Sequence, residues 1–263
     1  MIDLHRREDG SPLRIGHRGA PALAPENTLR SYRAAVRAGV DVIEFDVLDL
    51  PRGPLVIAHS DHLYEVSRGA ARGSVRSLPL AALRELAPEL PTLDEALEFF
   101  TDEAQDVGLH VDLKLRGRLD ELGAAIVRHG LGGRTVVSAF HAASLRELAR
   151  HSPEVRIGRT YPNDRFGVSR RRRAQPAVTL GLSAMRASVP LRLRRLVARA
   201  GATAVMLQHR LVTPAAVARA HEIGVPMLAW TVDELADFER VVAAGVDGVI
   251  TNDPRIFLAT LPS

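Results

Sequence analysis

The feature that most constrains the fold is an alternation of short apolar runs with longer segments of helical period along nearly the whole chain. Eight runs rich in valine, isoleucine and leucine end at Gly16, Val47, Lys114, Ser138, Arg159, Leu207, Thr231 and Thr251. Helical segments between them include residues 27–38, 93–100, 119–128, 142–150, 214–223 and 234–243. This alternation is typical of parallel strands joined by helical crossovers. Eight strands predict a closed (β/α)₈ barrel, the TIM barrel fold.

A ninth apolar run, Leu55 to Ala58, follows the second run after only the turn sequence of residues 51–54. A parallel return needs roughly a dozen or more residues. The ninth run is therefore predicted to be a hairpin arm that extends the second strand.

Residues 60 to 91 interrupt the alternation with short segments. The interruptions fall at Gly69, Gly73, Pro79, Pro88 and Pro91. This pattern predicts a small insertion after the second strand, placed over the mouth of the barrel where it can shape a pocket. A length of 263 residues suits one barrel, and no repeat or long linker divides the chain, so residues 1–263 are predicted to form a single domain.

Composition excludes several classes of protein. The chain has no cysteine, which rules out disulfides, thiolate catalysis and zinc–sulfur sites. The first seven residues carry charge where a secretory signal would need an apolar core. No apolar run approaches the roughly 20 residues needed to span a bilayer. We therefore expect a soluble, cytoplasmic protein.

Basic residues cluster between Arg165 and Arg199, with four consecutive arginines at 170–173. A patch of this kind can make weak contact with an anionic membrane, although most charge runs are simply solvated surface. Aromatic residues make up only 4% of the chain and are not interleaved with the patch, so no nucleic-acid partner is expected.

Three carboxylates are expected to meet at the carboxyl ends of the barrel strands, where such folds gather their chemistry. Glu44 and Asp46 are two apart in one strand and so face the same side, and Asp112 lies near the end of the next barrel strand. Carboxylates without thiolates suit a hard divalent cation, Mg²⁺ or Ca²⁺. Arg18 and Lys114 add positive charge, which favours an anion such as a phosphoryl group.

His17 and His59 end the first strand and the hairpin arm. Two histidines beside a metal-bound phosphate can divide the roles of general acid and general base, and the implied reaction is cleavage of a phosphodiester. The sequence assigns neither histidine to either role.

Three further residues are candidates for the pocket. Glu26 and Asn27 follow Pro25, so they equally suit the start of a helix. Trp230 ends a strand, where it would either line the pocket or belong to the core.

These residues occur in ordered motifs that resemble those of the glycerophosphodiester phosphodiesterases, from Gly16 to Pro254. The motifs are His17-Arg18-Gly19, Pro25-Glu26-Asn27-Thr28, Glu44-Phe45-Asp46-Val47, His59, Asp112-Leu113-Lys114, Ser138-Ala139-Phe140, Trp230-Thr231-Val232 and residues 245–251. The resemblance implies a metal-dependent barrel enzyme that hydrolyses a glycerophosphodiester to glycerol 3-phosphate and an alcohol. It also implies that His17 and His59 are the acid–base pair, that Glu44 and Asp46 bind metal, and that Arg18 and Lys114 contact phosphate.

The chain departs from the family pattern at four places. Asp112 stands where glutamate is usual, Ser60 where aspartate is common, with Asp61 one place later as a candidate substitute, and Asn252 where aspartate is common. Residues 50–53 replace the usual Thr-Lys-Asp-Gly turn. None of these changes removes a catalytic group, so hydrolysis remains the expected function.

Two other functions share the same site residues. One is a lysophospholipase D-type activity on membrane lysolipids, in which the insertion and the arginine-rich segment would help to dock a lipid surface. The other is a non-catalytic barrel that binds a phosphate ligand, which would have no need of two histidines.

Overall fold

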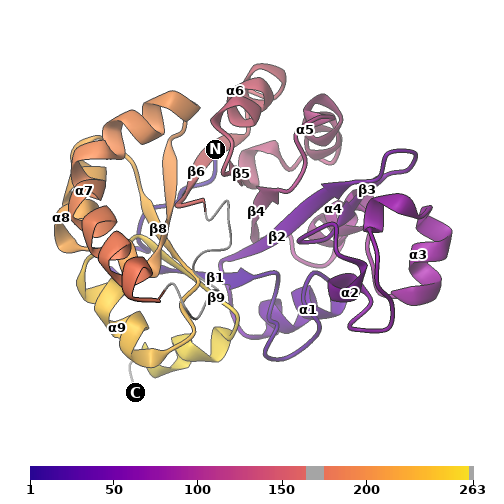
Figure 1. Ribbon diagram of the computed structural model, residues 1–263, viewed down its shortest axis with the longest axis horizontal. Helices are drawn as coiled ribbons and strands as arrows, with labels where there is room; N and C mark the ends of the chain where they lie inside the picture. The colour runs from indigo at the N-terminus through magenta and orange to yellow at the C-terminus, as the bar shows by residue number, and fades with distance from the viewer. Residues whose placement is uncertain (164–174, 261–263) are drawn as a thin grey trace.

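The computed structural model describes residues 1–163 and 175–260, and these form the predicted closed barrel (Figure 1). Eight parallel strands pair around the barrel, and the β1–β9 pairing closes it. They are β1 (Leu13–His17), β2 (Val42–Asp49), β4 (Gly108–Leu113), β5 (Thr135–Ala139), β6 (Arg156–Tyr161), β7 (Ala204–Gln208), β8 (Met227–Trp230) and β9 (Gly248–Thr251). Each strand ends within two residues of its predicted end.

The ninth apolar run is a hairpin arm, as predicted. It forms β3 (Leu55–Ile57), which pairs antiparallel with the end of β2 through Val47 opposite Ile57. The arm carries the chain beyond the barrel rim before His59.

Helices surround the barrel (Figure 1). Those that follow the barrel strands are α1 (Leu29–Arg37), α4 (Leu93–Asp102), α5 (Leu119–Arg128), α6 (Ala142–His151), α7 (Gln175–Ala200), α8 (Pro214–Glu222) and α9 (Leu235–Ala243). The prediction that the first helix starts at Asn27 is wrong by two residues. Asn27 has a left-handed backbone (φ 56°), and the Thr28 hydroxyl accepts a hydrogen bond from the Ser31 N–H as the N-cap.

Side chains along β2 point alternately to the hydrophobic core outside the barrel and to the barrel interior. Phe45 points outward and packs with Tyr32 of α1 and Phe100 of α4. Phe99 of α4 packs with the same two rings, and ring-centroid distances within this group are 5.4–5.9 Å. Its neighbours on either side face the barrel interior because successive strand residues point to opposite faces. The aromatic cluster therefore fixes the strand that carries two of the candidate metal ligands.

The barrel interior holds a smaller apolar cluster, of which Met206 and Ile250 reach the carboxylates. It consists of Leu4, Ile15, Val42, Val136, Ala204, Met206, Leu228 and Ile250. These side chains are buried, so this part of the barrel is a packed core and not a channel.

The segment between β3 and α4 contains two short helices, α2 (Leu63–Val66) and α3 (Leu80–Leu86), beside the hairpin arm (Figure 1). Its buried apolar side chains form their own cluster with the outer parts of β2 and β3. The members are Leu48, Leu50, Val56, Ala58, Leu63, Val75, Leu83, Ala87 and Leu90.

The sequence analysis proposed no helix for the arginine-rich region, whereas residues 175–200 form α7 with Pro190 inside it. Val189, Leu193 and Val197 recur every four residues and are buried, which places one face of the helix on the barrel. The arginines at 192, 194, 195 and 199 are exposed, while those at 165 and 170–173 lie outside the described residues. Among the described helices, none has the length and apolar character that crossing a membrane requires. The cytoplasmic location stays a prediction.

The aromatic cluster generates a stability prediction. Phe100 is fully buried, so Phe100→Ala should lower the free energy of unfolding by about 3–5 kcal/mol through lost burial and the cavity left behind. The matched control is Val127→Ala on the exposed side of α5, which should change it by less than about 0.5 kcal/mol. Urea denaturation measures both, and equal midpoints would contradict the role given to the cluster.

Candidate active site

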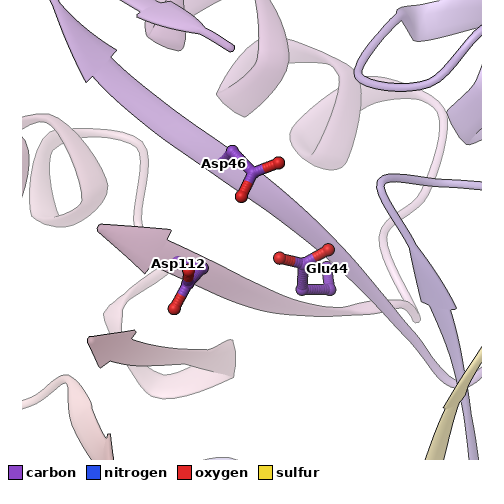
Figure 2. A group of neighbouring side chains, drawn as sticks. All are labelled: Glu44, Asp46 and Asp112. Carbon is purple, nitrogen blue, oxygen red and sulfur yellow. The ribbon is translucent and has the colours of Figure 1, made fainter. Parts of the chain in front are cut away.

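Three carboxylates from neighbouring strands converge inside one end of the barrel. Glu44 and Asp46 project from β2, and Asp112 projects from β4, where it is directly opposite Asp46 in the strand pairing (Figure 2). One oxygen of each lies within 4.8 Å of the others, and all three residues are buried. Parallel pairing and the two-residue spacing on β2 thus bring together the three predicted ligands.

Two cations partly neutralise these carboxylates. Lys114 Nζ lies 2.9 Å from Asp46 Oδ1 and 2.5 Å from Asp112 Oδ2, and Arg18 Nε lies 3.1 Å from Asp46 Oδ2. Burial alone would raise the pKa of Asp46, but Lys114 and Arg18 outweigh burial and hold the pKa below its usual range. Burial raises the pKa of Glu44 well above its usual range, and the charges of Asp46 and Asp112 raise it further.

The donor set fits a hard divalent cation. Three carboxylates against two cations leave negative charge in excess, and the charges of Asp46 and Asp112 add to burial in raising the pKa of Glu44. Asp46 Oδ1 is buried, and within the described part of the chain its close polar neighbour is Lys114 Nζ at 2.9 Å, without hydrogen-bond geometry. Oxygen ligands of this kind suit Mg²⁺ or Ca²⁺.

The turn after β1 explains the first two sequence motifs. Arg18 has a left-handed backbone, and its N–H donates to Glu44 Oε2 at 2.9 Å. Gly19 follows with φ 88°, and a Cβ there would lie 2.4 Å from Ser31 Oγ. The Asn27 amide donates to Asp46 Oδ2 at 2.8 Å, and its backbone N–H donates to the Arg18 carbonyl. Glycine is therefore required at position 19, and Asn27 contacts a candidate ligand directly.

His17 ends β1 beside the carboxylates. Its Nδ1 lies 2.7 Å from Asn252 Oδ1, and its Nε2 lies 3.9 Å from Glu44 Oε2. The Asn252 amide donates in turn to Asp233 Oδ2 at 2.7 Å, so the amide oxygen faces the histidine. Burial, and then the charge of Arg18, lowers the pKa of His17 to about 4.

His59 comes from a different element and lies just after the hairpin arm, two residues beyond the end of β3. Its Nδ1 lies 3.3 Å from Glu65 Oε2, and the Ser60 hydroxyl donates to the same oxygen at 2.7 Å. Asp61 does not substitute for the aspartate that the family pattern places at position 60. Its carboxylate instead accepts hydrogen bonds from the hydroxyl of Ser74 and the backbone N–H of Arg76.

A small cavity of about 90 Å³ lies among these groups. Trp230 lines it, with its indole N–H donating to the Met206 carbonyl and its ring against Phe140. A larger pocket of about 740 Å³ borders it at His59 and extends between the β1–α1 loop and the insertion. Glu26 and Asn27 line this larger pocket, and Glu26 also accepts a hydrogen bond from Arg18 Nη1 at 2.8 Å.

His110 is not among the predicted site residues, but it lines the small cavity and is 2% exposed. Its Nε2 lies 2.9 Å from Ser138 Oγ, and that hydroxyl donates to Asp112 Oδ1 at 2.6 Å. Burial lowers the pKa of His110 to about 4. The two-residue spacing from Asp112 was the available signal, because it places both side chains on the inner face of β4.

The fold and the gathered carboxylates, cations and histidines define a barrel hydrolase of phosphoric diesters. A sequence profile of the Glycerophosphoryl diester phosphodiesterase family matches residues 17–256. The chain belongs to this family, which confirms the resemblance seen in its motifs.

Known proteins match this chain in sequence or in fold over nearly its full length. The chain is 27% identical to a glycerophosphodiester phosphodiesterase of Caldanaerobacter subterraneus subsp. tengcongensis, over 94% of this chain and 96% of that protein. The fold matches a Thermotoga maritima glycerophosphodiester phosphodiesterase (TM-score 0.71, 20% identity, 95% and 98% covered). It also matches an Oleispira antarctica phosphodiesterase solved with the product sn-glycerol-3-phosphate (TM-score 0.72, 23% identity, 96% and 97% covered).

The charge balance predicts the effect of removing Lys114. Lys114→Met leaves Asp46 and Asp112 buried without their shared ammonium, so in chelator the free energy of unfolding should fall by about 3–5 kcal/mol. Lys114→Arg keeps the positive charge and should lower the free energy of unfolding by less. Urea denaturation in EDTA tests both variants. A methionine variant as stable as the wild type would show that Lys114 does not compensate the charges of Asp46 and Asp112.

Proposed function

We propose that this protein hydrolyses glycerophosphodiesters to glycerol 3-phosphate and an alcohol, with a bound Mg²⁺ or Ca²⁺. The observation that carries the proposal is the convergence of three carboxylates, two cations and two histidines at one end of a barrel from this family. The single domain over residues 1–263, with residues 60–91 as its insertion, is part of the same proposal.

Glu44, Asp46 and Asp112 would hold the divalent cation, since they are the buried acidic oxygens that converge. Such a cation polarises phosphoryl oxygens and offsets the charge that grows on them during displacement. Asn27 and Ser138 support the ligands by donating hydrogen bonds to Asp46 and Asp112.

Arg18 and Lys114 are proposed to contact the phosphate. Both lie beside the small cavity and both already pair with carboxylates, so their positions are set before substrate arrives. Fixed cations of this kind stabilise developing negative charge without a cost of reorganisation during the reaction.

His17 and His59 are proposed to be the general acid and base. One removes a proton from the attacking nucleophile, and the other protonates the departing alcohol oxygen. The nucleophile is either water, or the free glycerol hydroxyl beside the phosphate, which gives a cyclic phosphate that water then opens to glycerol 3-phosphate. Both line the small cavity, but from different elements, β1 and the hairpin arm. The Nδ1 of each lies near a side-chain oxygen, of Asn252 and of Glu65, which leaves both Nε2 atoms for proton transfer.

The larger pocket next to His59 is proposed to take one end of the substrate. Glu26 and Asn27 line it, whereas Trp230 lines the small cavity and offers an apolar ring there. Lysolipids remain the alternative substrates, and the membrane contact through the arginine-rich region stays a prediction.

The direct test is release of glycerol 3-phosphate from glycerophosphocholine and glycerophosphoethanolamine. Wild type should release it with Mg²⁺ or Ca²⁺ and not in EDTA. His17→Ala and His59→Ala should each lower kcat by about 10²- to 10⁴-fold, because a proton-transfer group is lost. The exposed His151→Ala on α6 is the matched control and should behave as wild type.

No release with any metal would overturn the proposed substrate. The same enzyme would then be offered lysophosphatidylcholine in vesicles, where release of choline would favour the lysolipid alternative. Binding of glycerol 3-phosphate without turnover of either substrate would favour a binding-only protein.

Metal binding has its own prediction, independent of turnover. At a concentration about 100 times the Kd, Mg²⁺ or Ca²⁺ should raise the free energy of unfolding by about 2.7 kcal/mol. Glu44→Gln and Asp112→Asn should lose most of this gain, whereas the exposed Glu85→Gln should keep it. Urea denaturation at several metal concentrations measures the gain, and equal gains in all four proteins would place the cation elsewhere.

A further inference from the structure

We propose that Glu65 is a positioning residue that holds the His59 imidazole in one tautomer, with Ser60 fixing the Glu65 carboxylate. The inference rests on the proposed acid–base role of His59. It concerns the place where this chain departs from the family pattern, because Ser60 stands where aspartate is common.

The contacts run from His59 through Glu65 and Ser60 to the backbone of the insertion. His59 Nδ1 lies 3.3 Å from Glu65 Oε2, and Ser60 Oγ donates to that same oxygen at 2.7 Å. Ser60 Oγ itself accepts a hydrogen bond from the His62 backbone N–H at 3.1 Å. The Glu65 N–H donates to the His62 carbonyl in the first turn of α2. Hydrogen bonds with the His62 backbone therefore hold both Ser60 and Glu65 in place.

This geometry decides which nitrogen carries the proton. Burial acts to raise the pKa of Glu65, but hydrogen bonds from Ser60 and His59 lower it below its usual value, so the carboxylate is ionised at neutral pH. An ionised carboxylate only accepts hydrogen bonds, so His59 Nδ1 must be the protonated nitrogen. Nε2 is then left to act in the small cavity that His59 lines with Asp46 and Lys114.

Asp61 cannot serve the same purpose in this fold. Its carboxylate accepts from Ser74 Oγ and from the Arg76 N–H, each at 2.8 Å, and its Oδ2 lies 4.0 Å from Arg76 Nη1. These contacts tie the insertion together and leave Asp61 turned away from the histidine. Glu65 therefore supplies the carboxylate that residue 60 lacks.

The kinetic test compares Glu65→Gln with Asp61→Asn. Glu65→Gln replaces an acceptor-only carboxylate by an amide that can either accept from Nδ1 or donate to it, so it no longer selects one tautomer. It should lower kcat by about 10-fold and should change KM less than kcat. Asp61→Asn removes a carboxylate that only binds the insertion together, so it should leave kcat unchanged. An equal fall in both variants would mean that Glu65 is merely structural.

A rescue variant sharpens this comparison. An aspartate at position 60 would extend a carboxylate toward the place where Ser60 Oγ now meets Glu65 Oε2. Ser60→Asp in the Glu65→Gln background should therefore recover most of the lost kcat. A wild-type kcat for Glu65→Gln would overturn the inference, and so would a failure of Ser60→Asp to raise the lowered kcat of that variant.

The tautomer can be measured without any turnover. In ¹⁵N-labelled wild type, the His59 imidazole should show a protonated Nδ1, and Glu65→Ala should shift it toward a mixture of tautomers. A wild type protonated at Nε2, or a spectrum unchanged in Glu65→Ala, would overturn the inference. An inactive wild type that still shows the Nδ1 tautomer would overturn the proposed function alone.

Discussion

Mutual repulsion among three buried carboxylates is the constraint around which this site is built. Glu44, Asp46 and Asp112 offer oxygens within 4.8 Å of one another, and at that distance two unit charges repel by roughly 3 kcal/mol at an effective dielectric constant of about 20. The strand pairing keeps the two aspartates close together, because Asp46 and Asp112 are directly opposite in register. The barrel tolerates the cluster only because Lys114 and Arg18 reach into it, and even so the pKa of Glu44 stays raised. A divalent cation is the simplest further source of compensation.

The β1–α1 turn supplies part of this charge compensation, because it positions Arg18. Arg18 can reach Asp46 only because the chain reverses sharply after β1, and the reversal needs the left-handed backbone of Arg18 and Gly19. Asn27 takes a third left-handed position, so that its amide donates to the same carboxylate. The two motifs that look separate in the sequence thus form one structural unit. Its backbone cost is balanced by contacts to the buried carboxylates of Glu44 and Asp46.

Much of this arrangement could be predicted from the sequence, because strand alternation and the two-residue spacing are local signals. The eight strands, the hairpin arm and the three carboxylates follow from those signals, and the structure contains all of them. Helix α7 was missed because Pro190 and dense arginines hide its four-residue spacing of buried positions. The partner of His59 could not be predicted either: sequence proximity favours Asp61, whereas the contacts inside the insertion turn Asp61 away and bring Glu65 close.

The two histidines therefore depend on different parts of the fold. His17 ends a barrel strand, and its Asn252 partner directly follows β9, so the closed barrel fixes both. His59 lies beyond the barrel, and its orientation depends on the insertion that supplies Glu65. The same insertion forms one wall of the pocket that borders His59. A change in that segment alters the shape of the pocket and the orientation of His59 together, while the carboxylates of β2 and β4 stay where the barrel holds them. In this architecture, the shape of the larger pocket is coupled to the orientation of His59 far more closely than to the positions of the three carboxylates.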